Sequence, residues 1–253
     1  MQTIRSRKLD SYWKDDISRQ WYLIEDRNGN PLGYREAFWR KTHNGFSGAN
    51  RLVLRKEGHV ENWQVSSDAA RGQYVAVSDT SGGGRDRTQI MLQDGLVIVA
   101  KAAPNTLGEA QNRAPGNYVP EGLLPLAIVE AARLGQKVSF KTIINEQAII
   151  QGMVYFSLVT VIPQGPNEVR VESVGLGEGT ESVYRLDDQA RIVAIEYGGG
   201  AMVEKLVSFR ELTDAFPHLA EEENQEDIRQ QAPPYPDNEG RQQDITTSPG
   251  ITA

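Results

Sequence analysis

The sequence has no cysteine among its 253 residues, which excludes disulfide bonds, thiolate catalysis and cysteine-ligated metal sites. Long hydrophobic runs are also missing. The longest apolar run lies within Val119–Gly135 and is too short to cross a bilayer, so we expect a chain that does not span the membrane. Histidine is scarce, and His43, His59 and His218 lack the spacing of metal ligands. We therefore expect no metal and no other cofactor.

Motifs of catalysis are absent as well. The chain has no Gly-x-Ser-x-Gly elbow, and the Ser81–Asp86 stretch, although rich in glycine, lacks the Gly-Lys-Ser/Thr ending of a phosphate-binding loop. Paired carboxylates leave no sequence signal, since two strand residues can meet from distant positions. The acidic residues on expected strands are Glu25, Glu36, Glu172 and Glu196. Outward-facing charge is the ordinary role for such residues, so we predict that the protein is not an enzyme.

The net charge of −7 is concentrated at the C-terminal end. Residues 220–253 contain eight acidic and two basic residues and are rich in Gln and Pro, a composition that cannot bury enough apolar area to fold. We expect this segment to be a disordered acidic tail. The remainder is nearly neutral and lacks the basic surplus that phosphate-dominated binding needs, which argues against nucleic acid as a partner.

Residues 1–19 form a polar lead-in whose basic start is not followed by an apolar core. It is therefore not a signal peptide as written. On that basis we expect a cytoplasmic protein, or a periplasmic or otherwise exported one if an export segment has been removed.

From Trp21 onward the pattern is typical of an antiparallel meander. Apolar and polar residues alternate in short runs with turn signals roughly every 8–12 residues, as expected for about ten strands. Asn28-Gly29 predicts a hairpin with a type I′ turn, which requires positive φ at both residues. The stretch 102–118 has no period and is expected to be a long loop.

One helix interrupts this meander, and we expect it over 122–134. Its residues are apolar nearly all round, leaving Glu130 and Arg133 as a narrow polar stripe, so it must be covered on several sides. Pro120 or Pro125 suits its first turn, and Gly135 suits the left-handed residue after its end.

The strand Arg191–Tyr197 carries apolar groups on both faces, so something must cover its concave side. Ile192 and Ala194 are expected on one face, with Val193, Ile195 and Tyr197 on the other. The helix is the large apolar element available to cover it. The predicted fold is mostly β: a single domain over 20–219, in which a curved antiparallel sheet or half-barrel wraps around one central α-helix.

This arrangement resembles the half-barrel of the bacterial lipoprotein-carrier superfamily, which sorts outer-membrane lipoproteins. The resemblance is carried by Val119–Gly135 as a plug, by the strands 137–140 and 169–174, and by the hairpin 182–197 with its acidic turn. It covers roughly 20–216 by the order of elements, and no stretch of it is a diagnostic motif. Members of that family hold acyl chains in the helix-lined concavity, so the resemblance implies lipid binding.

Two functional hypotheses follow, and an enzyme that uses converging carboxylates ranks third behind them. The first is a non-enzymatic binding protein that holds an apolar, lipid-like or acyl-like ligand between sheet and helix. The second is a structural or protein-interaction domain with a filled core, acting through a sheet edge or the acidic tail. For the first hypothesis, the residues expected to line the ligand are apolar or aromatic and come from the helix and two strands: Leu124, Ile128, Ala131, Trp39, Val193, Ile195 and Tyr197.

Overall fold

The computed structural model describes residues 17–43, 45–55, 58–68, 74–81, 86–103, 106–143, 149–150, 153–175, 179–189 and 191–219. The chain divides into two compact units, Met1–Leu212 and Thr213–Ala253, and the first contains the sheet and the main helix. Most of the predicted lead-in and the whole predicted tail over 220–253 lie outside the described residues.

Sixteen strands and three helices are assigned in the part of the chain that the structure describes. In order, they are β1 (Ile17–Asp26), β2 (Pro31–Thr42), β3 (Gly45–Leu54), β4 (His59–Asp68), β5 (Tyr74–Ser81), β6 (Asp86–Gln93), β7 (Leu96–Ala103), β8 (Thr106–Arg113), the 3-10 helix η2 (Glu121–Leu123), α1 (Leu124–Leu134), β9 (Val138–Thr142), β10 (Ile149–Ile150), β11 (Met153–Val154), β12 (Ser157–Pro163), β13 (Glu168–Val174), β14 (Gly179–Leu186), β15 (Ile192–Tyr197), β16 (Met202–Val207) and α2 (Phe209–Ala215).

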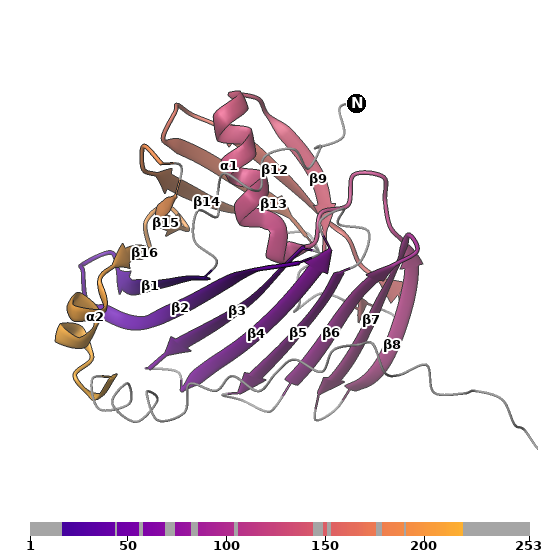
Figure 1. Ribbon diagram of the computed structural model, residues 1–253, viewed down its shortest axis with the longest axis horizontal. Helices are drawn as coiled ribbons and strands as arrows, with labels where there is room; N and C mark the ends of the chain where they lie inside the picture. The colour runs from indigo at the N-terminus through magenta and orange to yellow at the C-terminus, as the bar shows by residue number, and fades with distance from the viewer. Residues whose placement is uncertain are drawn as a thin grey trace, which may run out of the picture. The chain divides into compact units, whose positions relative to one another are not determined.

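Fourteen of these strands form one curved antiparallel sheet, and β10 and β11 form a separate pair. The sheet consists of two meanders, β1 to β8 and β9 with β12 to β16, joined where β1 pairs with β16 (Figure 1). It does not close, because β8 and β9 are its two edges. The predicted class, a mostly β protein with a curved antiparallel sheet and one central helix, is confirmed.

The strand count exceeds the expected ten partly because the loop predicted over 102–118 is wrong. Eight of its 17 residues form the edge strand β8, which pairs with β7 from Leu96↔Arg113 to Ala103↔Thr106. Its residues have little intrinsic strand preference. Pairing along an available edge and burial of Ala110 override that preference, as tertiary context often does in sheets.

Helix α1 lies against β12 and β13 on the concave side of the sheet (Figure 1). It begins with Pro125 in its first turn and is followed by Gly135 in the left-handed region at φ 60°, as the sequence predicted. Its buried residues occupy most of its circumference: Leu126, Ala127, Ile128, Val129, Ala131 and Ala132. The helix therefore fills the centre of the core instead of lying on its surface.

Two turns show how local chemistry sets the strand register. The hairpin predicted at Asn28-Gly29 joins β1 to β2, but the type I′ assignment is wrong, because only Gly29 has positive φ. Asp26 holds this turn instead, since its carboxylate accepts the N–H groups of Asn28 and Asn30 at 2.8 and 2.9 Å. Asp94-Gly95, with φ of 51° and 75°, is the two-residue turn of the primed kind, and it joins β6 to β7.

The hairpin β14–β15 contains a bulge that changes the predicted faces. Leu186 pairs with Ile192 and Arg185 pairs with Ala194, which leaves Val193 as the extra residue. Simple alternation separates Ile192 from Ile195, whereas the bulge returns both side chains to the buried face. The face predicted for Ile192 is therefore wrong, while Ile195 and Tyr197 keep theirs.

Candidate functional site

A cavity of about 370 Å³ lies between the concave face of the sheet and the start of α1. Its lining comes from three parts of the first unit: the strands β1 to β4, the segment Glu121–Leu126, and the strands β14 and β15. These parts are far apart in the sequence, so the cavity exists only because β1 pairs with β16 and brings the two meanders together.

The floor of the cavity consists of two rows of side chains that run across β1 to β4. Each row follows directly from the strand register, because residues opposite one another in neighbouring strands point to the same face. The first floor row is Gln20, Ala37, Asn50 and Trp63. The second floor row is Tyr22, Arg35, Leu52 and Glu61.

The start of the helix forms the roof, and a glycine lets it come close to the floor. A Cβ added to Gly122 would lie 2.1 Å from Cη2 of Trp63 and 2.8 Å from the hydroxyl oxygen of Tyr74. No side chain larger than hydrogen fits there without displacing an aromatic ring. Beyond this contact, Leu124 and Pro125 remain partly exposed and face the cavity.

A buried ion pair lies at one end of the floor. Arg35 of β2 reaches across β1 to Glu204 of β16, whose side chain is only 2% exposed. The hydroxyl of Tyr197 accepts a hydrogen bond from Arg35 Nη2 at 3.2 Å and donates one to Glu204 Oε1 at 3.0 Å. Burial by itself would lower the pKa of Arg35, but the Glu204 carboxylate and the Tyr197 phenol outweigh it and raise that pKa. Arg35 and Glu204 are therefore a charged but mutually neutralised pair.

The phenols around this pair hold their protons tightly. Burial raises the pKa of Tyr184 to about 12 and also raises the pKa of Tyr197, in both cases despite the opposing effect of Arg35. Both groups are therefore neutral at physiological pH, and both residues line the cavity.

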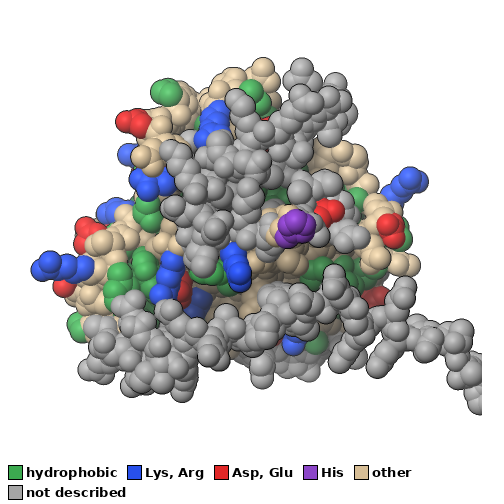
Figure 2. All heavy atoms as spheres, in the orientation of Figure 1, with side chains coloured by type: hydrophobic (Ala, Val, Ile, Leu, Met, Phe, Trp, Pro, Cys, Tyr) green, Lys and Arg blue, Asp and Glu red, His purple; other side chains and the backbone are tan. Residues whose placement is uncertain are grey.

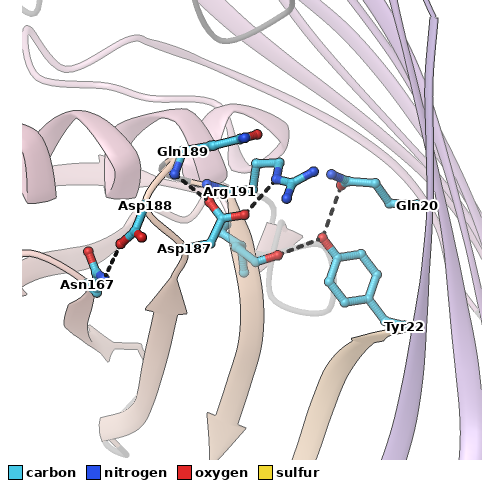
Figure 3. A network of polar contacts seen from close by, with 8 residues as sticks. Gln20, Tyr22, Asn167, Asp187, Asp188, Gln189 and Arg191 are labelled. Carbon is cyan, nitrogen blue, oxygen red and sulfur yellow. Dashed lines mark hydrogen bonds and ion pairs between the residues drawn. The ribbon is translucent and has the colours of Figure 1, made fainter. Parts of the chain in front are cut away.

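Tyr22 connects the floor to the opposite wall. Its hydroxyl lies 3.0 Å from Gln20 Oε1 and 3.3 Å from the backbone oxygen of Ile192, within donating distance of both (Figure 3). The turn before Ile192 is held by Asp187. Partial burial alone would raise the pKa of Asp187, but bonds from the backbone and side chain of Arg191 lower it. This turn fixes the strand that carries the wall.

Three of the seven residues predicted to line a ligand meet in this cavity: Leu124, Ile195 and Tyr197. Ile128 and Ala131 are 0% and 1% exposed and belong to the packed core around α1, outside the cavity lining.

The other two have different positions. Val193 is the half-buried bulge residue and does not line the cavity. The side chain of Trp39 lies outside the described residues, although its backbone belongs to β2. Ligand contact by any of the seven stays a prediction.

Sequence reasoning missed the polar half of the lining. Arg35, Asn50, Glu61 and Glu121 all face the cavity, and none lies in a recognisable motif. The available signal was weak. Arg35 is two residues from the inward Ala37 in β2, so the two side chains share the concave face. The register between strands, which brings Asn50 and Glu61 beside it, is not readable from one sequence.

The carboxylates considered in the sequence lie elsewhere. Within the described residues, the four each form an ion pair and none lines the cavity; the pairs are Glu25–Lys205, Glu36–Arg19, Glu172–Arg170 and Glu196–Arg185. Two different carboxylates, Glu61 and Glu121, share the cavity instead.

Acidic and basic side chains are interspersed on the face shown in Figure 2. In the part of the chain that the structure describes, no three His, Asp or Glu side chains gather as metal ligands would. No helix there is both long enough and apolar enough to cross a membrane.

Scans of the chain against protein families and against curated protein sequences find no match. Among solved structures, the chain is similar to the β-barrel-like protein of the domain of unknown function DUF1849 from Brucella abortus, with a TM-score of 0.52 and 14% identity. That likeness covers 75% of this chain and 95% of the other. A DUF1089 family protein from Pseudomonas aeruginosa aligns with a TM-score of 0.39 and 14% identity, over 66% of this chain and 90% of the other. The likeness to the Brucella abortus protein therefore shows a barrel-like fold.

Proposed function

We propose that the protein is a non-enzymatic binding protein that holds an apolar, lipid-like or acyl-like chain between the concave sheet and the start of α1. The cavity of about 370 Å³ carries this proposal, because the sheet and the helix both contribute to its walls. Its volume falls within the range of roughly 300–1,000 Å³ that is usual for small-molecule sites. Leu52, Leu124 and Ile195 give it an apolar surface on the floor, roof and wall, respectively.

The resemblance to the lipoprotein-carrier half-barrel supports the same proposal. In that family a helix lies across a curved antiparallel sheet and acyl chains are held between the two. The order of elements here, with α1 placed between two meanders, is compatible with this arrangement. The barrel-like structural neighbour supports the fold alone.

Native mass spectrometry of the freshly purified full chain tests the proposal directly. We expect a bound species of lipid mass that is released on denaturation. A spectrum of the bare chain, unchanged after incubation with acyl chains, would contradict the proposal.

A cavity-filling variant tests the location. Ala37 lies in the middle of the first floor row and is 7% exposed, so Ala37→Leu places a larger side chain in the cavity. We expect the fold to be retained and chain binding to be lost. Ala102→Leu is the matched control, because Ala102 is exposed on β7 and outside the cavity. Equal binding by both folded variants would place the ligand elsewhere.

The second candidate is a structural or protein-interaction domain with a filled core. The close packing of Ile128 and Ala131 favours it, since the middle of α1 leaves no space for a ligand. Contact with a partner would then use the sheet edges β8 and β9 or the segment 220–253. Deleting 220–253 separates acyl-chain binding from a partner held by the tail: binding of an acyl chain survives the deletion, whereas the tail-held partner is lost.

A further inference from the structure

The charges in the cavity lining are unequal. Arg35 is the only lysine or arginine among the described lining residues, and Glu204 already neutralises it. The carboxylate of Glu61 also lines the cavity, and its recorded partner among the described residues is the uncharged hydroxyl of Ser78. The cavity is therefore acidic toward a ligand, and a ligand carboxylate placed beside Arg35 would also lie close to Glu204.

Hydrogen-bond acceptors with spare capacity lie beside Trp63 in the cavity lining. Oδ1 of Asn50 is buried and has no hydrogen-bond donor among the described residues, a costly arrangement unless a bound group supplies one. Asn50 is opposite Trp63 in the register, and Glu61 is the next inward residue before Trp63 on β4. Glu61 accepts one hydrogen bond, from Ser78 Oγ at 3.0 Å, and retains further acceptor capacity.

An aromatic ring also lies in this part of the cavity lining. Trp63 lies in the first floor row next to these acceptors and under the helix start at Gly122. The face of an indole ring attracts a cation, and a neighbouring carboxylate accepts a charge-assisted hydrogen bond from an ammonium group. Arg35 does not compete for this position. It is two strands away from Glu61, about 10 Å at the backbone, and its charge is already balanced.

Building on the proposed function, we propose that the ligand is a single-chain amphiphile whose head is an ammonium group. The head lies against Glu61, Asn50 Oδ1 and the ring of Trp63, and the chain extends over Leu52 toward Leu124. This arrangement provides the cation that the acidic lining needs and the donor that Asn50 lacks. It also excludes a free fatty acid as the preferred ligand.

Three probes that differ only in the head group test the proposal by calorimetry with the full chain: dodecylammonium, dodecanoate and monododecanoylglycerol, each below its micelle concentration. We expect dodecylammonium to bind at least about tenfold more tightly than dodecanoate, the effect of one charge-assisted hydrogen bond. Added salt should weaken dodecylammonium binding and leave the neutral probe unchanged.

Glu61→Gln should weaken dodecylammonium about tenfold while leaving the neutral probe within about twofold. Glu168→Gln removes the same charge from an exposed position on β13 and should change neither. Equal or tighter binding of dodecanoate, or an equal effect of the two variants, would overturn the ammonium assignment while leaving a chain-binding protein. Failure of all three probes to bind would overturn the proposed function and the head group together.

Discussion

Breaking the buried pair Arg35–Glu204 should destabilise the protein far more than breaking an exposed pair. In Arg35→Met the carboxylate of Glu204 stays buried, 2% exposed, and loses its counter-charge. Its Oε2 already has no hydrogen-bond partner in the described structure, so only the Tyr197 hydroxyl remains to solvate it. An uncompensated buried charge of this kind costs about 3–5 kcal/mol of the free energy of unfolding.

Removing both charges should recover much of that loss. In the double variant Arg35→Met/Glu204→Leu no charge is buried, and replacement of a buried ion pair by apolar residues is often close to neutral. The Tyr197 hydroxyl then loses both of its recorded partners, which costs about 1–3 kcal/mol. We therefore expect the double variant to be more stable than Arg35→Met alone, the sign of strong coupling between the two sites.

Urea unfolding followed by circular dichroism measures these differences through the transition midpoint, provided that its slope stays constant. The matched control is Arg185→Met. Arg185 pairs with Glu196 at 2.7 Å, but its side chain is 53% exposed, so the expected cost is below about 1 kcal/mol. The reasoning is refuted if Arg35→Met costs no more than this control, or if the double variant loses the sum of its two single substitutions.

Two further predictions concern the roof and the wall of the cavity. Gly122→Ala should displace the ring of Trp63, change its fluorescence and cost about 1–3 kcal/mol, and unchanged urea unfolding and emission would contradict the close contact. Burial raises the pKa of Tyr184 in the folded state to about 12, above its ordinary value of 10. Its contribution to the free energy of unfolding is therefore fully present below pH 10 and is lost as the pH rises through 12. Ultraviolet titration should show a late phenolate step that disappears in Tyr184→Phe, and an unaltered titration of this variant would show that another group titrates there.

The elements that could be predicted from the sequence are those whose signal is local. Helix α1 combines an apolar run with Pro125 at its start and Gly135 at its end, and each of these features acts within a few residues. The strand β8 lacked such a signal, because its formation depends on pairing with β7. The helix and the sheet class could therefore be read directly, whereas the edge strand β8 could not.

The cavity depends on register, which a single sequence does not determine. Val193 shows how sensitive a face is to one residue: the bulge there moves Ile192 to the side of Ile195. Similarly, Arg35 and Glu61 share a floor row only because two successive strand pairings are aligned. Their meeting follows from turns and bulges distributed over the chain, so the sequence could indicate the concave face but not its chemistry.

The two candidate functions apply to different turns of the same helix. In the middle of α1, Ile128 is fully buried, and packing of this density serves stability. At the start of α1, Leu124 and Pro125 remain partly exposed and line the cavity, next to the point where Gly122 meets Trp63. A helix that served only as core would favour equally tight packing along its length. The open first turn, placed over a charged and hydroxylated floor, is therefore the feature that favours ligand binding over a purely structural role.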